Sequence, residues 1–127
     1  MFTKIPFFGG TFVAVLVCAP SLAGPAVSTG WVSWYGAWHE GRRTSSGCVF
    51  HAADLTAASP TLPFGTLLRL TRGDHSVIVQ INDRGPYVRA RVLDLSRAAA
   101  DALEMRHIGV ARVGIENLGR TSLRCRR

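Results

Sequence analysis

The sequence predicts a small, closed, mainly β domain with one short helix over residues 30–118. Six short segments have strand character, and turns containing Gly and Pro separate several of them. One segment, residues 76–82, has an apolar side chain at every second position, which indicates one buried face. A helix is expected only after Ser96. Strands this short leave exposed edges unless the sheet closes, so we expect a barrel.

The first two strands are expected at residues 31–35, where aromatic side chains occupy both faces, and at residues 55–58. Residues 36–50 between them contain three glycines and a polar run, which is typical of a loop. A turn framed by two prolines follows the second strand and ends at Gly65.

The third and fourth strands are expected at residues 66–71 and 76–82, with a tight connection at Gly73. In the fourth strand the side chains on the predicted buried face are Val77, Val79 and Ile81. Those on the opposite face are Ser76, Gln80 and Asn82.

The last elements alternate strand, helix and strand. Residues 89–95 form an extended segment, and Ser96 can cap a helix over residues 97–105 because its hydroxyl can accept from a free backbone amide. Residues 111–117 complete the set as a sixth strand.

The N-terminus has the three parts of a secretory signal peptide. Lys4 supplies a positive charge, residues 5–17 are mostly apolar, and residues 21–23 place small side chains at the two positions that a signal peptidase inspects. We therefore expect residues 1–23 to be removed on export and residues 24–29 to form a linker. A membrane anchor is the alternative, but a spanning helix needs about 20 apolar residues and this run is shorter. We expect no stable membrane span and a location in the periplasm or cell envelope.

The cysteines fit an exported protein. Lipid attachment at Cys18 is disfavoured by the bulky Val17 before it, and signal cleavage would remove this cysteine. Cys48 remains, with Cys125 in a basic tail at residues 119–127. An oxidising compartment permits a disulfide between them, worth about 4 kcal/mol in the chain-entropy model because the loop is long. Two free thiols are the alternative.

No metal or cofactor is predicted, because no close pair of Cys or His has the spacing of zinc ligands. The histidines are scattered along the chain, and we expect each on the surface: His39, His51, His75 and His107.

The formal net charge is +7, and every basic side chain after Lys4 is Arg. Arg pairs with carboxylates and phosphates through two-point contacts, so a polyanionic partner is one interpretation. Nucleic acid and carboxylate-rich wall polymer are both candidates, and the export signal argues against nucleic acid. Charge that serves only solubility is the alternative.

Asp83 is the residue most expected to carry chemistry. It follows Ile81 in period two, so it is expected on the apolar side where the strand ends. Desolvation there would raise its pKa and make it a usable general acid, whereas Arg84 would favour the carboxylate. The sequence leaves this balance open. A turn residue that binds backbone amides before Gly85 and Pro86 is the alternative.

Five segments then carry a resemblance to a known family: GWVSWYG at 30–36, LPFG at 62–65, VQINDRGP at 79–86, RVLDLSRAAA at 91–100, and residues 109–116. In this order they closely resemble the rare-lipoprotein-A family of septal-ring-type lytic transglycosylases. The resemblance covers nearly all of the chain after the signal. It implies a six-stranded double-psi β-barrel with one short helix, in a bacterial envelope protein that acts on peptidoglycan.

The resemblance also implies a reaction. The family cleaves the bond between N-acetylmuramic acid (MurNAc) and N-acetylglucosamine (GlcNAc), preferably in strands lacking stem peptides. The muramic 6-hydroxyl traps the sugar cation and leaves a 1,6-anhydro end, so one catalytic Asp83 could act first as acid and then as base. The expected substrate-binding residues are Tyr35, Thr44, Arg84, Trp34 and Asn82. The expected partners are glycan strands, with division-site proteins as further candidates, and the expected role is wall organisation and daughter-cell separation.

Two positions depart from the family pattern. Relatives usually carry a Glu where Cys48 follows Gly47, and a His where Ser59 follows Ala58. The polar groups that would assist Asp83 are therefore absent, and of these residues only the Asp is carried over.

A wall-binding or expansin-like module without catalysis is the alternative function. Trp34, Tyr35 and Trp38 could stack on sugar faces while the arginines hold carboxylates. Core packing is the alternative for these aromatic residues.

Overall fold

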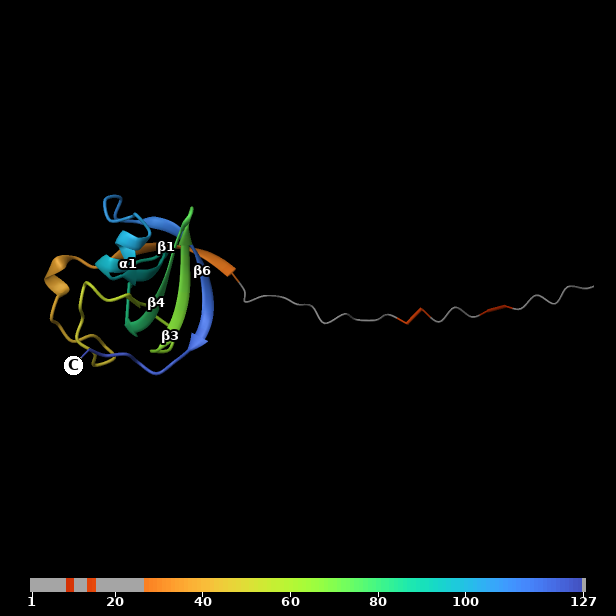
Figure 1. Ribbon diagram of the computed structural model, residues 1–127, viewed down its shortest axis with the longest axis horizontal. Coiled ribbons are helices and arrows are strands. Elements are labelled where there is room, and N and C mark those ends of the chain that lie inside the picture. Colours follow the sequence, from red (N-terminus) through yellow and green to blue (C-terminus); the bar gives the residue numbers. More distant parts are fainter. Residues whose placement is uncertain (1–8, 11–13, 16–26, 127) are drawn as a thin grey trace, which may run out of the picture.

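The computed structural model describes residues 9–10, 14–15 and 27–126 (Figure 1). The expected signal peptide, apart from four isolated positions, and Cys18 lie outside the described residues.

The described chain forms a closed six-stranded β-barrel with one short α-helix, which confirms the predicted fold class. The strands are β1 (Val27–Trp34), β2 (Thr56–Ala58), β3 (Thr66–Arg72), β4 (His75–Asp83), β5 (Arg91–Leu95) and β6 (Ala111–Arg120). A 3-10 turn, η1 (Ala37–His39), follows β1, and the helix α1 (Arg97–Ala102) follows β5.

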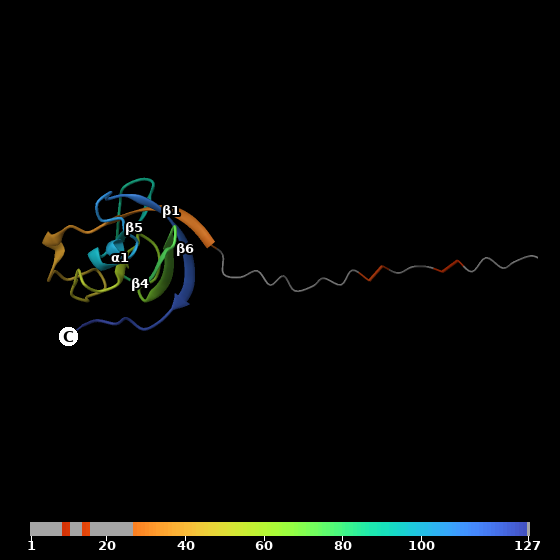
Figure 2. The same cartoon turned by 45° about the horizontal axis from the view of Figure 1, so that its top comes forward.

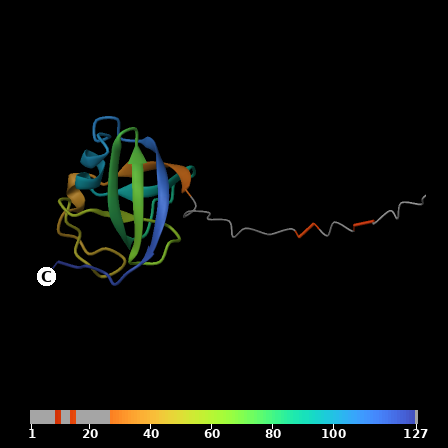
Figure 3. The ribbon, with the colours of Figure 1, turned by 45° about the vertical axis from the view of Figure 1, so that its right-hand side comes forward.

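The strands close in the order β1-β5-β2-β4-β3-β6. The pairs β1/β5 and β2/β4 are parallel, and the other four pairs are antiparallel. Figure 3 shows β4, β3 and β6 side by side as long neighbouring strands, coloured from green to blue. Because the sheet is closed, each of these strands is paired with a neighbour on both sides.

The barrel interior is filled from the alternating faces of the strands, as predicted for β4. Val79 and Ile81 are fully buried and Val77 nearly so. The opposite face of β4 is less open than alternation suggests, because Gln80 and Asn82 are also buried. The C-terminal tail and the turn at residues 44–48 cover them.

The ends of the barrel differ from the expected boundaries. β1 begins at Val27, which pairs with Glu116 of β6, so residues 27–29 of the expected linker belong to the sheet. β6 likewise continues to Arg120, which pairs with Thr66, so the expected tail contributes two residues to the strand. In both cases a long partner strand provides backbone groups that the extra residues satisfy.

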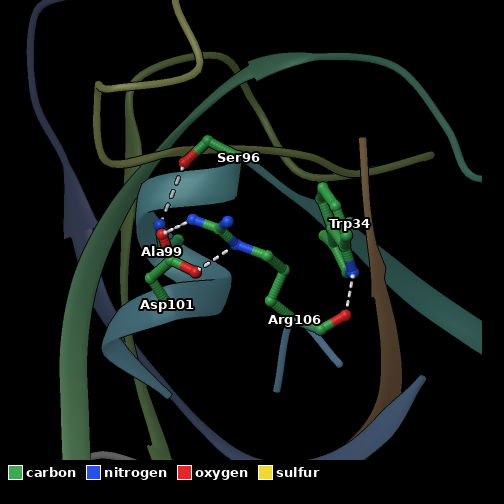
Figure 4. Close-up of polar contacts among 5 residues, drawn as sticks. All are labelled: Trp34, Ser96, Ala99, Asp101 and Arg106. Atoms are coloured by element: carbon green, nitrogen blue, oxygen red, sulfur yellow. Dashed lines mark hydrogen bonds and ion pairs between the residues drawn. The ribbon is translucent and has the colours of Figure 1, made fainter. Parts of the chain in front are cut away.

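The helix begins where expected and ends three residues early. The hydroxyl of Ser96 accepts from the Ala99 amide at 3.3 Å and caps the first turn (Figure 4). The guanidinium of Arg72 donates to the carbonyls of Leu103 and Glu104 at 3.1 and 3.2 Å, and Glu104 adopts a φ of 50°. The helix therefore ends at Ala102, and the guanidinium satisfies the two carbonyls that follow it.

Within the residues that the structure describes, no helix has both the length and the apolar character needed to cross a membrane.

Candidate functional site

Asp83 lies at the end of β4, where a register shift changes its neighbours. β2 pairs with β4 through Ala57 and Ile81 and then through Ala58 and Asp83, so Asn82 is an extra residue on β4. The alternation that holds through Ile81 therefore does not extend to Asp83, and the expectation that it continues the apolar face was wrong.

Two carboxyl groups occupy one row across neighbouring strands. Ala58 pairs with Asp83 of β4 on one side and with Asp94 of β5 on the other. Asp94 in turn pairs with Ser33 of β1. Directly paired residues present their side chains on the same face of a sheet. The two carboxyl groups therefore flank Ala58, with their Cα atoms about 10 Å apart, which is two strand spacings.

The Asp83 carboxylate accepts three hydrogen bonds. The Tyr35 hydroxyl donates to Oδ2 at 2.8 Å. The backbone amides of Ser45 and Arg84 donate to Oδ1 at 2.9 and 2.8 Å. These donors come from three separate parts of the chain, and together they fix the orientation of the carboxylate.

These contacts decide the charge state of Asp83. Burial is the largest single influence and raises its pKa, but the hydrogen bonds from Ser45, Tyr35 and Arg84 together outweigh it, so the pKa lies below its ordinary value. The guanidinium of Arg84 is turned elsewhere. It donates to the carbonyls of Ser59 and Leu62 at 3.2 and 2.7 Å and stacks 3.9 Å from the centre of the Phe64 ring.

Asp94 has the opposite electrostatics. Burial raises its pKa, while a hydrogen bond of 3.0 Å from the Ser33 hydroxyl and the positive field of His39 oppose the rise only in part. The charge of Asp83 adds to the rise. The site thus contains one carboxyl that favours the ionised form and a second that holds its proton to higher pH.

Tyr35 directly follows β1 and packs beside the row formed by Asp83, Ala58 and Asp94. It is buried in a small cluster with Phe50, Ala52 and Ala58. Burial, followed by the hydrogen bond to Asp83, raises the pKa of Tyr35 far above its ordinary value, so the phenol acts as a neutral donor. The partly exposed His39 packs 4.7 Å from the Tyr35 ring, centre to centre.

Thr44 and Asn82 make hydrogen bonds that hold the turn at residues 44–48. The buried Thr44 hydroxyl donates to the Cys48 carbonyl at 2.7 Å and so closes a turn over residues 44–48. The Asn82 carbonyl accepts from the Ser46 amide at 3.3 Å. Among the described residues the buried side-chain oxygen of Asn82 has no hydrogen-bond partner.

Trp34 is not brought to Asp83. Its indole donates to the Arg106 carbonyl at 3.2 Å, and the Arg106 guanidinium pairs with Asp101 of α1 (Figure 4). These residues line a separate cavity of about 530 Å³. Trp34 therefore joins β1 to the segment after α1, and its ring packs against the barrel core.

The two departing positions have structural roles. Cys48 forms a disulfide with Cys125, with Cα atoms 5.2 Å apart. Ser59 is buried, and its hydroxyl accepts from the Leu62 amide at 3.0 Å. Its own amide donates to the backbone carbonyl of Asp83 at 3.1 Å. Neither side chain hydrogen-bonds to the Asp83 carboxylate in the structure.

The described residues also line an open cavity of about 480 Å³ between β4 and the C-terminal tail. Leu67, Gln80 and Arg124 are among the residues that line it, whereas Asp83, Asp94 and Tyr35 are not. The candidate catalytic residues therefore lie outside this cavity.

Comparison with known families supports the resemblance of the sequence segments. Residues 27–115 match the family model described as lytic transglycolase. The chain belongs to this lytic transglycolase family. Its barrel is accordingly of the double-psi type.

Curated relatives in the family are longer proteins. The chain is 52% identical over 91 residues to the probable endolytic peptidoglycan transglycosylase RlpA of Treponema pallidum, a match that covers 70% of this chain and 29% of that protein. It is 42% identical over 92 residues to the endolytic peptidoglycan transglycosylase RlpA of Campylobacter jejuni, covering 71% and 34%. The match thus spans about a third of the length of these relatives.

Two solved structures have the same fold at low identity. The Streptomyces papain inhibitor superposes with a TM-score of 0.62 at 20% identity, covering 74% of this chain and 96% of the inhibitor. The apo expansin of Clavibacter michiganensis gives 0.59 at 20%, covering 76% and 52%. At this identity the likeness supports the barrel fold alone.

Proposed function

We propose that this domain is an endolytic peptidoglycan transglycosylase. It cleaves MurNAc–GlcNAc bonds in glycan strands poor in stem peptides and leaves 1,6-anhydro ends. The observation that carries the proposal is the row in which Asp83 and Asp94 flank Ala58 with oppositely shifted pKa values. Two carboxyl groups held in different protonation states are what acid–base cleavage of a glycosidic bond requires.

The two carboxyl groups divide the proton transfers. Asp94 in its protonated form donates to the glycosidic oxygen as the bond from that oxygen to the muramic C1 breaks. The electron pair of the bond stays on the oxygen, which becomes the GlcNAc hydroxyl. The charge of Asp83 stabilises the sugar cation that forms. The muramic 6-hydroxyl then bonds to C1 and gives its proton to Asp83, and solvent returns the two carboxyl groups to their starting states.

Tyr35 and the backbone amides have a positioning role in this scheme. They donate to Asp83 at 2.8 to 2.9 Å and keep its oxygens aligned before the substrate arrives. The exposed Trp38, over which Arg42 lies at 5.0 Å from the ring centre, is the aromatic surface that would meet a sugar ring.

The cellular setting follows from the same proposal. The N-terminal segment directs the domain to the periplasm or cell envelope, where it acts on the wall during its organisation and daughter-cell separation. Names of the relatives support peptidoglycan as the substrate. Division-site proteins are candidate partners.

The test is a digest of purified glycan strands lacking stem peptides, with products separated and weighed by mass spectrometry. Wild-type protein should release 1,6-anhydro ends, and Asp83→Asn and Asp94→Asn should each reduce the rate by about 10²- to 10⁴-fold. Asp74→Asn, in the exposed turn between β3 and β4, is the matched control and should retain the wild-type rate.

A non-catalytic wall-binding module is the second candidate. It is favoured by the structural use of Cys48 and Ser59 at the positions where relatives carry Glu and His. Pelleting of the wild-type protein with wall material, without anhydro products at any pH, would support it against the transglycosylase.

A further inference from the structure

The segment after β6 crosses one end of the barrel and is held there by Gln80 (Figure 2). The Gln80 side-chain amide donates to the Thr121 hydroxyl and the Ser122 carbonyl, each at 3.0 Å, and its oxygen accepts from the Arg124 amide at 3.0 Å. Gln80 is 7% exposed while its tail partners are exposed, so these bonds are partly shielded from water. A single side chain of β4 therefore hydrogen-bonds to three residues of the tail.

Gly65 brings the same tail close to the barrel backbone. The Thr121 amide donates to the Gly65 carbonyl at 2.9 Å, and the Gly65 amide donates to Ile81 of β4 at 2.8 Å. Gly65 has a φ of +91°, and a Cβ there would collide with the Thr121 carbonyl. The approach of tail and turn therefore requires glycine.

The tail is joined to the turn at residues 44–48 by the disulfide between Cys125 and Cys48. Within that turn the Cys48 carbonyl accepts from both the amide and the hydroxyl of Thr44, at 2.8 and 2.7 Å. The Gly47 amide donates to the Thr44 carbonyl at 3.0 Å. The turn is thus closed around Cys48, the residue that the disulfide joins to the tail.

The other side of this turn contacts the end of β4. The Ser45 amide donates to Oδ1 of Asp83 at 2.9 Å, and the Ser46 amide donates to the Asn82 carbonyl at 3.3 Å. A continuous set of contacts therefore runs from Gln80 through the tail and the disulfide to the Asp83 carboxylate.

We infer that the tail at residues 121–126 is a positioning element of the site, which acts through the Cys48–Cys125 disulfide to hold the Ser45 amide on the Asp83 carboxylate. Gln80, Cys48 and Cys125 are positioning residues, since none of them contacts the carboxylate itself. The catalytic consequence rests on the proposed function, whereas the effect on the carboxylate does not.

The other groups around Asp83 do not depend on the tail. Tyr35 donates from the position directly after β1, Asp94 adds negative charge from β5, and the Arg84 guanidinium is held on the Ser59 and Leu62 carbonyls. Removing the tail contact therefore removes one identifiable donor. A carboxylate that loses a donor binds its proton more tightly, so its titration moves to higher pH.

The experiment follows the carboxyl carbon of Asp83 by NMR during a pH titration, together with hydrogen exchange of the Ser45 amide. Two variants weaken the connection separately: Cys48→Ser with Cys125→Ser, and Gln80→Met with the disulfide intact. Both should move the Asp83 midpoint to higher pH and speed Ser45 exchange by at least about tenfold. Arg126→Gln, beyond the disulfide on the same tail, removes an ion pair with Asp54 and should change neither reading.

An unchanged Asp83 midpoint in both variants, even with lower thermal stability, would overturn the inference and leave the tail a stabilising segment. If the double cysteine variant does not fold, Gln80→Met gives the decision alone. Neither reading needs substrate, so a protein without transglycosylase activity would refute the proposed function and leave this inference standing.

Discussion

Tyr35 donates its phenolic hydrogen to Asp83 across 2.8 Å, from the position directly after β1, a strand that is not adjacent to β4. The ring can reach because Ala58, which lies between the two carboxyl groups of the row, is small and fully buried beneath it. The contact joins the hydrophobic cluster that contains Tyr35 to the charged Asp83 carboxylate.

Tyr35→Phe should therefore raise the pKa of Asp83 and reduce the free energy of unfolding by about 1 kcal/mol at pH 7. The folded pKa of Asp83 is lowered, so the stability it contributes is present above the unfolded value of about 3.9 and is lost as the pH falls through the folded pKa. Denaturant unfolding at neutral and at acid pH measures this, and the difference between variant and wild type should shrink at acid pH. Tyr87→Phe, at a side chain 82% exposed, is the control. A difference that stays constant with pH would show that the hydroxyl acts without Asp83.

Asp94→Asn should lower activity without lowering stability. Because burial raises the folded pKa of Asp94, its favourable contribution to stability is complete below the unfolded pKa and is lost as the pH rises through the folded value. At neutral pH the buried Asp94 carboxylate therefore reduces the stability of the fold. An Asn side chain at this position still accepts the hydrogen bond from Ser33 and carries no charge, so it removes this destabilisation. Thermal unfolding at pH 7 should give an unchanged or higher midpoint. A large fall in the midpoint would mean that the Asp94 charge is stabilising.

The two tryptophans before and after Tyr35 should separate structure from binding. Trp34→Phe loses the hydrogen bond to the Arg106 carbonyl and should lower thermal stability while KM stays the same. Trp38 is 66% exposed, so Trp38→Ala should weaken pelleting with glycan strands and leave stability nearly unchanged. The reverse pattern, with binding lost in Trp34→Phe alone, would place the sugar surface beside α1.

The elements of the fold could be predicted because they depend on local patterns. The alternation of Val77, Val79 and Ile81 identified the buried face of β4, and Ser96 identified the start of the helix. The end of the helix could not be predicted, because the carbonyl of its C-cap Leu103 is bound by Arg72, which lies 31 residues earlier in sequence.

The site was predictable only in part. Asp83 and Tyr35 were expected and are brought together, but the Ser45 donor is a backbone amide, which no side-chain pattern reveals. Asp94 was missed because an acid between Leu93 and Leu95 has the pattern of an ordinary outward-facing residue. Its partnership with Asp83 depends on the pairing of both with Ala58 and on the register shift in β4, which are properties of the assembled sheet.

The proposed mechanism requires Asp83 and Asp94 to hold different charges within one site. The most direct measurement is an NMR titration of both carboxyl carbons in the folded domain. We expect Asp83 to titrate below the ordinary range of an aspartate and Asp94 above it, and the Asp94 midpoint to fall in Asp83→Asn because a neighbouring negative charge is removed. Midpoints that coincide, or that occur in the reverse order, would contradict the division of roles between the two carboxyl groups.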